Sequence, residues 1–180
     1  MARRAELDEF DHRLLELLQH DAGTTLAALG ETVGLSPSTV QRRITRYRRQ
    51  GLLRQVAVLD PAVLGDTTLA AVWVTMERES AKRHAAFCAR MRAAPEVQQC
   101  YVLGGEWDYL VILATRDIAH CREVAERLFR DECNLKRYET RLVFDVVKLG
   151  LNLPTRPMVR RKALALAPSP PNGGEGWGGV

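Results

Sequence analysis

The chain has 180 residues, of which 46% are hydrophobic and 27% are charged, and this composition is typical of a globular protein with one or two domains. No apolar run approaches the ~20 residues that a membrane-spanning helix needs, and the N-terminus lacks the apolar segment of a secretory signal, so a cytoplasmic protein is expected. The net charge of +4 is modest, but seven acidic residues precede Ser36 and six basic residues lie between Arg42 and Arg54. This polarity is typical of a DNA-facing surface backed by an acidic one.

Two short helices are predicted at the start of the chain. Residues 8–19 have apolar side chains at helical spacing, and Asp8 can cap the first turn. After a turn at residues 21–24, Thr24 or Thr25 can cap a second short helix. Gly30 lies inside this second helix at a cost of ~1 kcal/mol against alanine, which we interpret as room for the next helix to cross closely.

A strongly basic third helix is predicted between Ser36, an N-cap followed by proline, and Gly51, which ends it. One apolar stripe of this helix consists of Val40, Ile44 and Tyr47, and the opposite face carries Ser38, Gln41, Arg42, Thr45, Arg46 and Arg49. A solvated face normally mixes charges of both signs, whereas Ser36 to Arg54 contains six arginines and no acid. Because arginine suits phosphates and guanine edges, the pattern favours the recognition helix of a helix-turn-helix.

The candidate DNA-binding side chains are expected to differ in role. Arg42 and Arg46 are the first candidates for base edges, and Ser38, Gln41 and Thr45 are lesser ones. Arg48, Arg49 and Arg54 are candidates for phosphate contacts. Arg43, at the edge of the apolar stripe, either braces the fold or reaches a phosphate. Ser36 and Thr39, at the start of the helix, complete the set.

The rest of the chain predicts a second, α+β domain. Residues 52–59 are interpreted as a strand, followed by a turn at 60–66. Strands are then predicted at 68–76, 97–103, 108–115 and 136–149, with helices at 80–94 and 117–129. The order βαββαβ predicts a ferredoxin-like fold. The expected domains are a helix-turn-helix, winged-helix-like or plain, at 1–53, a linker at 54–66, the βαββαβ domain at 67–153, and a disordered tail at 154–180.

The predicted sheet is apolar on both faces. Leu110 and Ile112 face one way in the third strand, and Val111 and Leu113 face the other. The two helices of a βαββαβ unit cover only one face, and an uncovered apolar face is normally a partner surface. We therefore expect a homo-oligomer.

Neither a metal site nor a catalytic site is evident. Cys88, Cys100, Cys121 and Cys133 are widely spaced and none has a histidine at metal-ligand spacing, so reduced and mostly buried thiols are expected. No acid–base pair or nucleophile pattern is present either. The sequence therefore predicts no enzyme activity and no cofactor.

A helix-turn-helix joined to a βαββαβ domain resembles the Lrp/AsnC family of bacterial and archaeal transcriptional regulators. The resemblance extends from about Leu7 to Leu153. In the first domain, residues 7–15 are similar to the family's opening helix and residues 33–44 to its turn and recognition helix. Residues 59–65 are similar to the family's hinge. In the second domain, residues 105–109 are similar to its Gly-x-aromatic-Asp hairpin and residues 136–140 to the start of its last strand.

The resemblance implies a nucleoid-associated transcriptional regulator that binds double-stranded DNA. Members of the family form homodimers, often octamers, and bind a small effector, usually an amino acid. The effector site of the family lies at subunit contacts near the hairpin. The matching positions here are Gly104, Gly105, Glu106, Trp107, Asp108 and Thr140. Gly104 stands where the family more often has threonine.

The residue types of the hairpin are also compatible with amino-acid binding, independently of the resemblance. Two glycines let backbone N–H groups approach a carboxylate, while Glu106 or Asp108 can pair with an ammonium group and Trp107 can form a wall. The alternative is a tight turn in which the glycines only supply positive φ.

Two other functions remain open. Sirohaem decarboxylases resemble this family in layout, but they carry a His/Tyr/Arg-rich segment where this chain has residues 98–105, without histidine or arginine. A low-specificity architectural DNA-binding protein is the other alternative, because the family includes such members.

Overall fold

The computed structural model describes residues 6–77, 80–130 and 134–156. These residues form two compact units, one made of residues 6–55 together with 151–156 and the other of residues 56–150. The expectation of a disordered tail falls mostly on residues 157–180, which lie outside the described residues.

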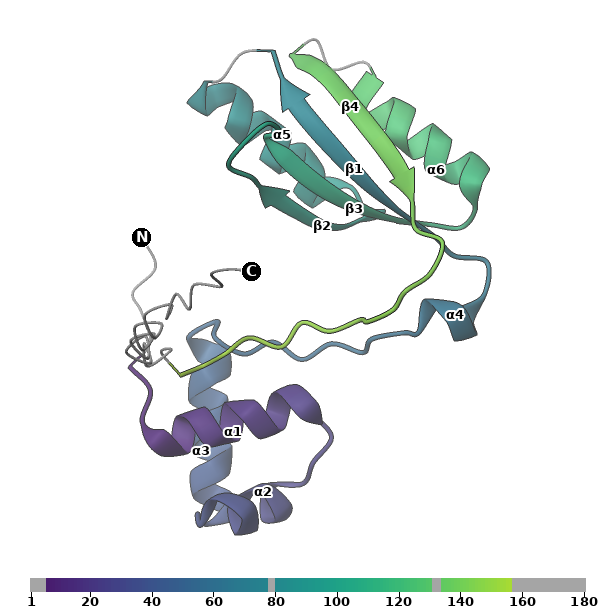
Figure 1. The fold of residues 1–180 in the computed structure, drawn as a ribbon. Helices are drawn as coiled ribbons and strands as arrows, with labels where there is room; N and C mark the ends of the chain where they lie inside the picture. Colours follow the sequence, from purple (N-terminus) through teal and green to yellow (C-terminus); the bar gives the residue numbers. More distant parts are fainter. Residues whose placement is uncertain (1–5, 78–79, 131–133, 157–180) are drawn as a thin grey trace, which may run out of the picture. The chain divides into compact units, whose positions relative to one another are not determined.

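The first unit contains three helices, α1 (Glu9–His20), α2 (Leu26–Val33) and α3 (Pro37–Arg49) (Figure 1). Asp8 caps α1 with a capping box, because its side chain accepts from the Asp11 N–H and the Asp11 side chain accepts from the Asp8 N–H. Thr25 caps α2. The core consists of the apolar stripes of the three helices: Leu14, Leu15, Leu18, Leu29, Val33, Val40, Ile44 and Tyr47. The predicted helices and the apolar stripe of α3 are confirmed.

The turn between α2 and α3 is closed by two glycines with different roles. Gly34 ends α2 in the left-handed conformation, with φ of 78°. At Gly30 a Cβ atom would lie 2.4 Å from the carbonyl oxygen of Leu35, and the N–H groups of Gly34 and Leu35 both bond to the Gly30 carbonyl. The close approach expected at Gly30 is therefore present, and it is made by the turn that leads into α3.

Residues 6–55 contain no strand among those described, so the first unit has the plain rather than the winged form of the motif. The strand expected at residues 52–59 is wrong. This segment leads without a sheet partner to a short helix, α4 (Pro61–Leu64), where only a turn was expected. Val56 and Val58 are about two-thirds exposed in this segment, since none of the described strands pairs with it.

The second unit has the predicted βαββαβ order. Its elements are β1 (Thr68–Met76), α5 (Ala81–Ala93), β2 (Val97–Val102), β3 (Tyr109–Thr115), α6 (Ile118–Ala125), a π-helical turn (Glu126–Arg130) and β4 (Leu135–Leu142). All strand pairs are antiparallel, and the strand order is β2-β3-β1-β4. The α+β, ferredoxin-like fold is confirmed.

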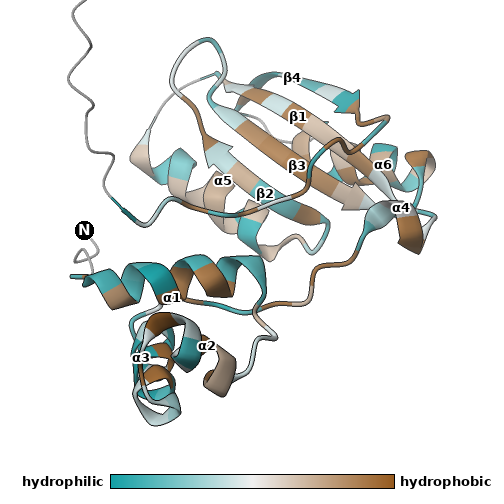
Figure 2. Cartoon of the chain, turned by 60° about the horizontal axis from the view of Figure 1, so that its bottom comes forward, coloured by the Kyte–Doolittle hydropathy of each residue, from teal (hydrophilic) through white to brown (hydrophobic). Residues whose placement is uncertain are grey.

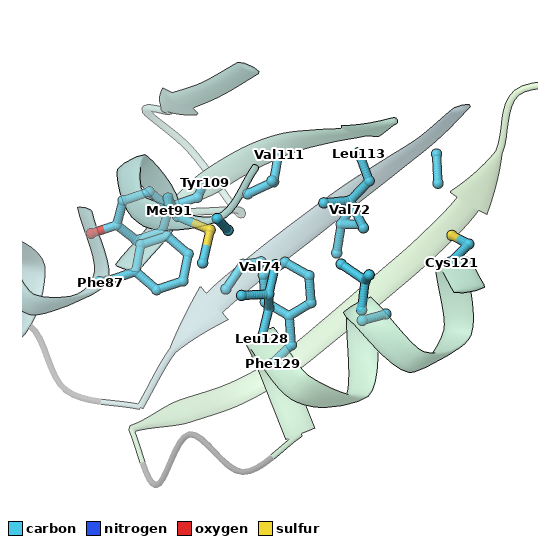
Figure 3. Close-up of a cluster of buried hydrophobic side chains, with 14 residues drawn as sticks. Val72, Val74, Phe87, Met91, Tyr109, Val111, Leu113, Cys121, Leu128 and Phe129 are labelled. Carbon is cyan, nitrogen blue, oxygen red and sulfur yellow. The ribbon is translucent and has the colours of Figure 1, made fainter. Parts of the chain in front are cut away.

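Both helices lie on one face of this sheet (Figure 1). Alternate residues of β1 and β3 point toward them and are fully buried: Ala70, Val72, Val74, Tyr109, Val111 and Leu113. The helices contribute Phe87 and Met91 of α5, Cys121, Val124 and Ala125 of α6, and Leu128 and Phe129 after α6, with Ala94 at the end of α5 (Figure 3). The period of two along the strands thus separates a helix-covered face from an open one.

The last strand is shorter than predicted. It ends at Leu142, not at residue 149, and the Val143 N–H makes the final bond to the Leu69 carbonyl. β1 begins at Thr68, so residues beyond Val143 have no strand to pair with, and Phe144 and Val147 are almost fully exposed. The prediction was too long because the alternation of apolar residues in the sequence continues beyond the end of the sheet.

The open face of the sheet carries half-buried apolar side chains in its two central strands. They are Leu69, Ala71, Trp73, Leu110 and Ile112. On β4 this face is charged, because Arg137, Glu139 and Arg141 alternate with Tyr138, Thr140 and Leu142 on the helix-covered face. Figure 2 shows the apolar residues of β1 and β3 beside the more polar β4. Within the described residues, no helix is long and apolar enough to cross a membrane.

Candidate DNA-binding face and effector hairpin

The outer face of α3 presents a row of polar side chains. Ser38, Arg42, Thr45 and Arg49 follow one another at i, i+4, i+7 and i+11, and all but the half-buried Thr45 are exposed. Their face is opposite the buried stripe of Val40, Ile44 and Tyr47 that holds α3 in the core. Arg42, Arg49 and Arg54 bond to no other group in the part of the chain that the structure describes, so their guanidinium groups are available to a ligand.

The first turn of α3 is ordered by hydroxyl groups. The Ser36 Oγ accepts a hydrogen bond from the Thr39 N–H at 3.3 Å and lies 2.9 Å and 3.1 Å from the hydroxyls of Thr39 and Ser38. Pro37 occupies the first helical position, where a missing N–H costs nothing. Ser36 is therefore a cap first, and its hydroxyl group is engaged locally.

A buried carboxylate of α1 holds the side of α3. Asp11 is 1% exposed, and its oxygens accept hydrogen bonds from the Tyr47 hydroxyl, from Arg43 Nη1 at 2.5 Å and from Arg46 Nη2 at 2.6 Å. Arg43 also donates to Asp8 at 2.8 Å. A buried carboxylate is tolerated only when it is paired and hydrogen-bonded, and here every partner comes from α3 or from the N-cap of α1.

This cluster shifts the protonation of its members. Burial alone would raise the pKa of the Asp11 carboxyl, but hydrogen bonds from Tyr47, the Asp8 backbone and Arg43 lower it to about 2. Burial and the hydrogen bond to Asp11 raise the pKa of the Tyr47 hydroxyl. Both shifts keep Asp11 ionised and Tyr47 protonated across the physiological range.

Three of the predicted DNA-contacting arginines are thus already engaged within the first unit. Arg43 is braced on Asp8 and Asp11, which agrees with the bracing alternative. Arg46 is tied to Asp11 although its side chain is 43% exposed. Arg48 donates to Gln55, whose amide in turn bonds to the Ala22 carbonyl.

The structure also assigns roles that the sequence patterns missed. The sequence patterns give Asp11 no role of its own, and they place Tyr47 only in the apolar stripe of α3. The available signal was the phenol itself, because a buried Tyr hydroxyl needs a hydrogen-bond partner and α1 supplies an acid on its first turn. Arg137, described next, was not singled out either.

The hairpin between β2 and β3 has one glycine that its backbone requires. Gly105 has φ of 130°, a conformation open to glycine, while Gly104 has an ordinary φ and open space where a Cβ would be. The Leu103 N–H bonds to the Asp108 carbonyl and closes the loop. The Asp108 side chain accepts from the Met76 N–H at 2.6 Å, beside the register shift in β1. Its carboxylate therefore already completes the end of a strand.

Arg137 of β4 connects the other two hairpin candidates. Its guanidinium lies 4.1 Å from the centroid of the Trp107 ring and its Nη2 atom lies 2.5 Å from Glu106 Oε1. The stacked cation and the carboxylate make one compact group on the open side of the sheet. A charged group of a ligand would therefore contact the ion pair of Arg137 and Glu106, and not an isolated Glu106 carboxylate.

Thr140 is not brought to the hairpin within one chain. It lies on the helix-covered face, in a groove of about 300 Å³ between β4 and α6 that also includes Ile118, Cys121, Tyr138 and Leu142. Arg137 alternates with it and faces the other way. The five loop candidates, Gly104 to Asp108, are contiguous, whereas Thr140 belongs to a different surface.

The described residues hold no group of three or more metal-ligating side chains. The expectation of mostly buried thiols is wrong in part, because Cys121 is buried but Cys88 is half-buried and Cys100 is exposed. Cys133 lies outside the described residues.

Comparison with known proteins agrees with this architecture. Residues 7–48 match the AsnC-type helix-turn-helix domain, and residues 69–153 match the Lrp/AsnC ligand-binding domain. An HTH-type transcriptional regulator of Sinorhizobium fredii is 32% identical over 83% of this chain and 89% of its own. The DNA-binding transcriptional activator DecR of Escherichia coli K12 is 30% identical over 82% of this chain and 98% of its own.

Solved structures agree as well. A transcriptional regulator of Neisseria meningitidis in complex with L-Met superposes with a TM-score of 0.72 at 29% identity, and the match covers 83% of this chain and 97% of the other. An AsnC family regulator from Agrobacterium tumefaciens superposes with a TM-score of 0.73 at 27% identity, over 82% and 97% of the two chains. The chain is therefore a member of the Lrp/AsnC family of DNA-binding transcriptional regulators.

Proposed function

We propose that the outer face of α3 binds DNA in the major groove, with Arg42 at base edges, Arg49 at a phosphate, and Ser38, Gln41 and Thr45 as smaller contacts. Arg42 and Arg49 have no internal partner among the described residues, which leaves their forks free for base edges or phosphates. Arg54 is exposed beyond the helix and suits a phosphate. This exposed, acid-free row on a helix braced from behind is the single observation that carries the proposal.

The remaining members of the candidate set act mainly through α3 itself. Arg43 and Arg46 orient the helix through Asp11, and the exposed side of Arg46 still allows a phosphate contact. Ser36 and Thr39 fix the first turn, whose N–H groups attract a phosphate at the helix N-terminus. Arg48, shared with Gln55, is a backbone contact at most.

The test begins with selection of bound duplexes from a random-sequence pool. We then expect Arg42→Ala to lower affinity for the selected duplex by roughly ten- to a hundredfold, as loss of a bidentate base contact does. Arg122→Ala is the matched control, because this arginine is 81% exposed on α6 of the other unit. Equal affinity of wild type and Arg42→Ala would refute the assignment.

The second unit is proposed to bind an amino-acid effector at the hairpin. The relative from Neisseria meningitidis was solved with L-Met. In this chain the N–H groups of residues 104–107 make no hydrogen bond within the described residues, and Arg137 adds a cation that suits an α-carboxylate. A thermal-shift screen of the twenty L-amino acids tests this, since a ligand of the folded state raises apparent stability. No shift with any of them would reject an amino-acid effector.

We further propose a homodimer, with octamers as an option, formed through the open sheet face. Apolar side chains of β1 and β3 are only half-buried there, and a flat apolar patch is stabilised by a second copy. A dimer would also supply two recognition helices for successive major grooves, about 34 Å apart. Sedimentation of wild type and Ile112→Glu tests the surface, and the variant is expected to be monomeric.

Two alternative functions have separate tests. The sirohaem-decarboxylase alternative receives no support from the relatives named above, which are regulators, and an absorbance scan after mixing with sirohaem checks it. For a low-specificity architectural role, a footprint on long DNA would show continuous protection in place of discrete half-sites. DNA binding also implies a nucleoid-associated, cytoplasmic location.

A further inference from the structure

The described chain returns to the helix-turn-helix unit after it leaves the sheet. β4 ends at Leu142, residues 143–150 follow without regular structure, and residues 151–156 belong to the first unit (Figure 1). The contacts of this last segment fall on α1, on the side that does not face the core.

Gln19 binds the backbone of the segment as a neighbouring strand would. Its Nε2 donates to the Leu153 carbonyl at 3.1 Å, and its Oε1 accepts from the Leu153 N–H at 2.6 Å. The Asn152 side chain donates to the Gln19 carbonyl at 3.3 Å. An amide that makes both bonds to one residue recognises an extended backbone whatever its sequence.

Two ion pairs fix the other end of the segment. Arg156 Nη2 lies 2.7 Å from Glu9 Oε1, and Arg156 Nε lies 3.3 Å from Glu16 Oε1. Glu9, Glu16 and Gln19 are at i, i+7 and i+10, so they form one stripe along α1. None of these residues belongs to the DNA-binding face or to the hairpin.

The contacts that hold residues 152–156 on α1 are weak enough for this segment to dissociate and bind again. The three charged side chains are each about half-exposed or more, and ion pairs in such positions are weak and screened by salt. Buried His12 Nδ1 and Thr155 Oγ1 lack a hydrogen-bond partner among the described residues, which opposes docking. Docking is nonetheless intramolecular, so the local concentration of the segment is high.

We propose that the α1 stripe Glu9–Glu16–Gln19 is a docking site for residues 152–156 of the same chain, which we name the strap, and that reversible docking of the strap regulates two-site DNA binding. A docked strap gives the helix-turn-helix unit two chain connections to the sheet domain, the linker after α3 and residues 143–150. A released strap leaves one. Residues 58–61 and 143–149 line a shared hollow of about 500 Å³ in the second unit, so the two connections run together there.

The regulatory effect follows from orientation. Two recognition helices of an oligomer engage two half-sites only when both are held at a suitable spacing, and a second connection reduces the freedom lost on binding. Binding to a single half-site needs no such arrangement. This part of the proposal rests on the DNA-binding function proposed above, whereas the docking itself does not.

The test uses the full chain with Arg156→Glu and, separately, Gln19→Ala. Lys148 lies in the exposed segment that precedes the strap, so a Lys-specific protease is expected to cleave after it faster when the strap leaves α1. We expect roughly tenfold faster cleavage after Lys148 in both variants, as loss of contacts of this kind implies, with cleavage after Lys136 in β4 as the internal control. Combining Arg156→Glu with Glu9→Arg and Glu16→Arg should restore the wild-type rate.

DNA binding is measured on duplexes with one and with two half-sites. We expect Arg156→Glu to weaken two-site binding roughly tenfold and to leave one-site binding unchanged, because only the two-site complex depends on pre-orientation. Equal cleavage in wild type and both variants would overturn the docking site. Faster cleavage with unchanged two-site affinity would overturn the regulatory role. Absence of DNA binding in the wild type would instead refute the proposed function, and cleavage would still decide the docking.

Discussion

The Asp11 carboxylate in α1 accepts a hydrogen bond from the Tyr47 hydroxyl at the centre of the helix-turn-helix unit. Tyr47 is fully buried and Asp11 is 1% exposed, so this bond joins the first and third helices where water is excluded. Arg43 and Arg46 complete the charge balance around it. The recognition helix is thus held by a polar cluster as well as by its apolar stripe.

Removing the Asp11 charge should destabilise the first unit. We expect Asp11→Asn to lower the free energy of unfolding by about 3 kcal/mol, because the buried end of Arg43 and the Tyr47 hydroxyl lose their common partner. Urea denaturation followed by circular dichroism measures this. Glu31→Gln, an exposed change on α2, is the control and should stay within about 0.5 kcal/mol. Similar values for the two variants would contradict the role of the cluster.

Acid should weaken the same cluster. The pKa of Asp11 in the folded chain is about 2, below its ordinary value of 3.8. A lowered pKa means that the stabilisation is complete above pH 3.8 and is lost as the pH falls from 3.8 toward 2, and it amounts to about 2 kcal/mol. Unfolding free energies measured between pH 5 and pH 2.5 should therefore fall less in Asp11→Asn than in wild type. Parallel pH curves for wild type and Asp11→Asn would argue against a contribution of the Asp11 charge to stability.

Substitution of Arg46 and substitution of Arg49 should have different effects on stability. Arg46→Ala removes a bond to buried Asp11, so we expect a loss of about 1–2 kcal/mol in stability together with weaker DNA binding. Arg49→Ala should leave the melting temperature unchanged and lower the salt dependence of DNA binding by about one unit of slope. Anisotropy titrations at several salt concentrations, with thermal melts, distinguish them. An unchanged melting temperature in Arg46→Ala would show that its bond to Asp11 is dispensable.

Gly30 should not accept a side chain. A Cβ atom there would lie 2.4 Å from the Leu35 carbonyl oxygen, which is backbone and cannot move without shifting the start of α3. We expect Gly30→Ala to destabilise the first unit by about 3 kcal/mol, although alanine is the better helix former. Ala27→Gly in the same helix serves as the comparison, with a cost of about 1 kcal/mol. Stabilisation by Gly30→Ala would contradict the observed approach.

The two hairpin glycines should respond differently. Gly105→Ala places a side chain at φ of 130° and is expected to cost about 2 kcal/mol, whereas Gly104→Ala should be nearly neutral in stability. The matched pair isolates the turn conformation from any ligand contact. Equal melting temperatures of the two variants would show that the strain is relieved by the loop.

Local chemistry in the sequence determined much of this protein. Caps at Asp8 and Ser36 predict the helices of the first unit, and the alternation along β1 and β3 predicts the central strands of the sheet. These signals act over a few residues, so no knowledge of distant neighbours was needed. The separation of an apolar stripe from a basic face in α3 was equally local.

Tertiary structure decided what each polar side chain does. The sequence could not tell Arg42 from Arg46, because only the packing of α1 against α3 puts Asp11 within reach of one and not the other. The family resemblance groups Thr140 with the hairpin at a subunit contact, and within one chain strand alternation puts Thr140 on the opposite face of the sheet from Arg137. The extent of the last strand depended on where β1 begins, and the contact of Arg156 with Glu9 joins residues 147 apart. Pairings over such distances follow from the assembled fold, since the spacing of residues along the chain carries no trace of them.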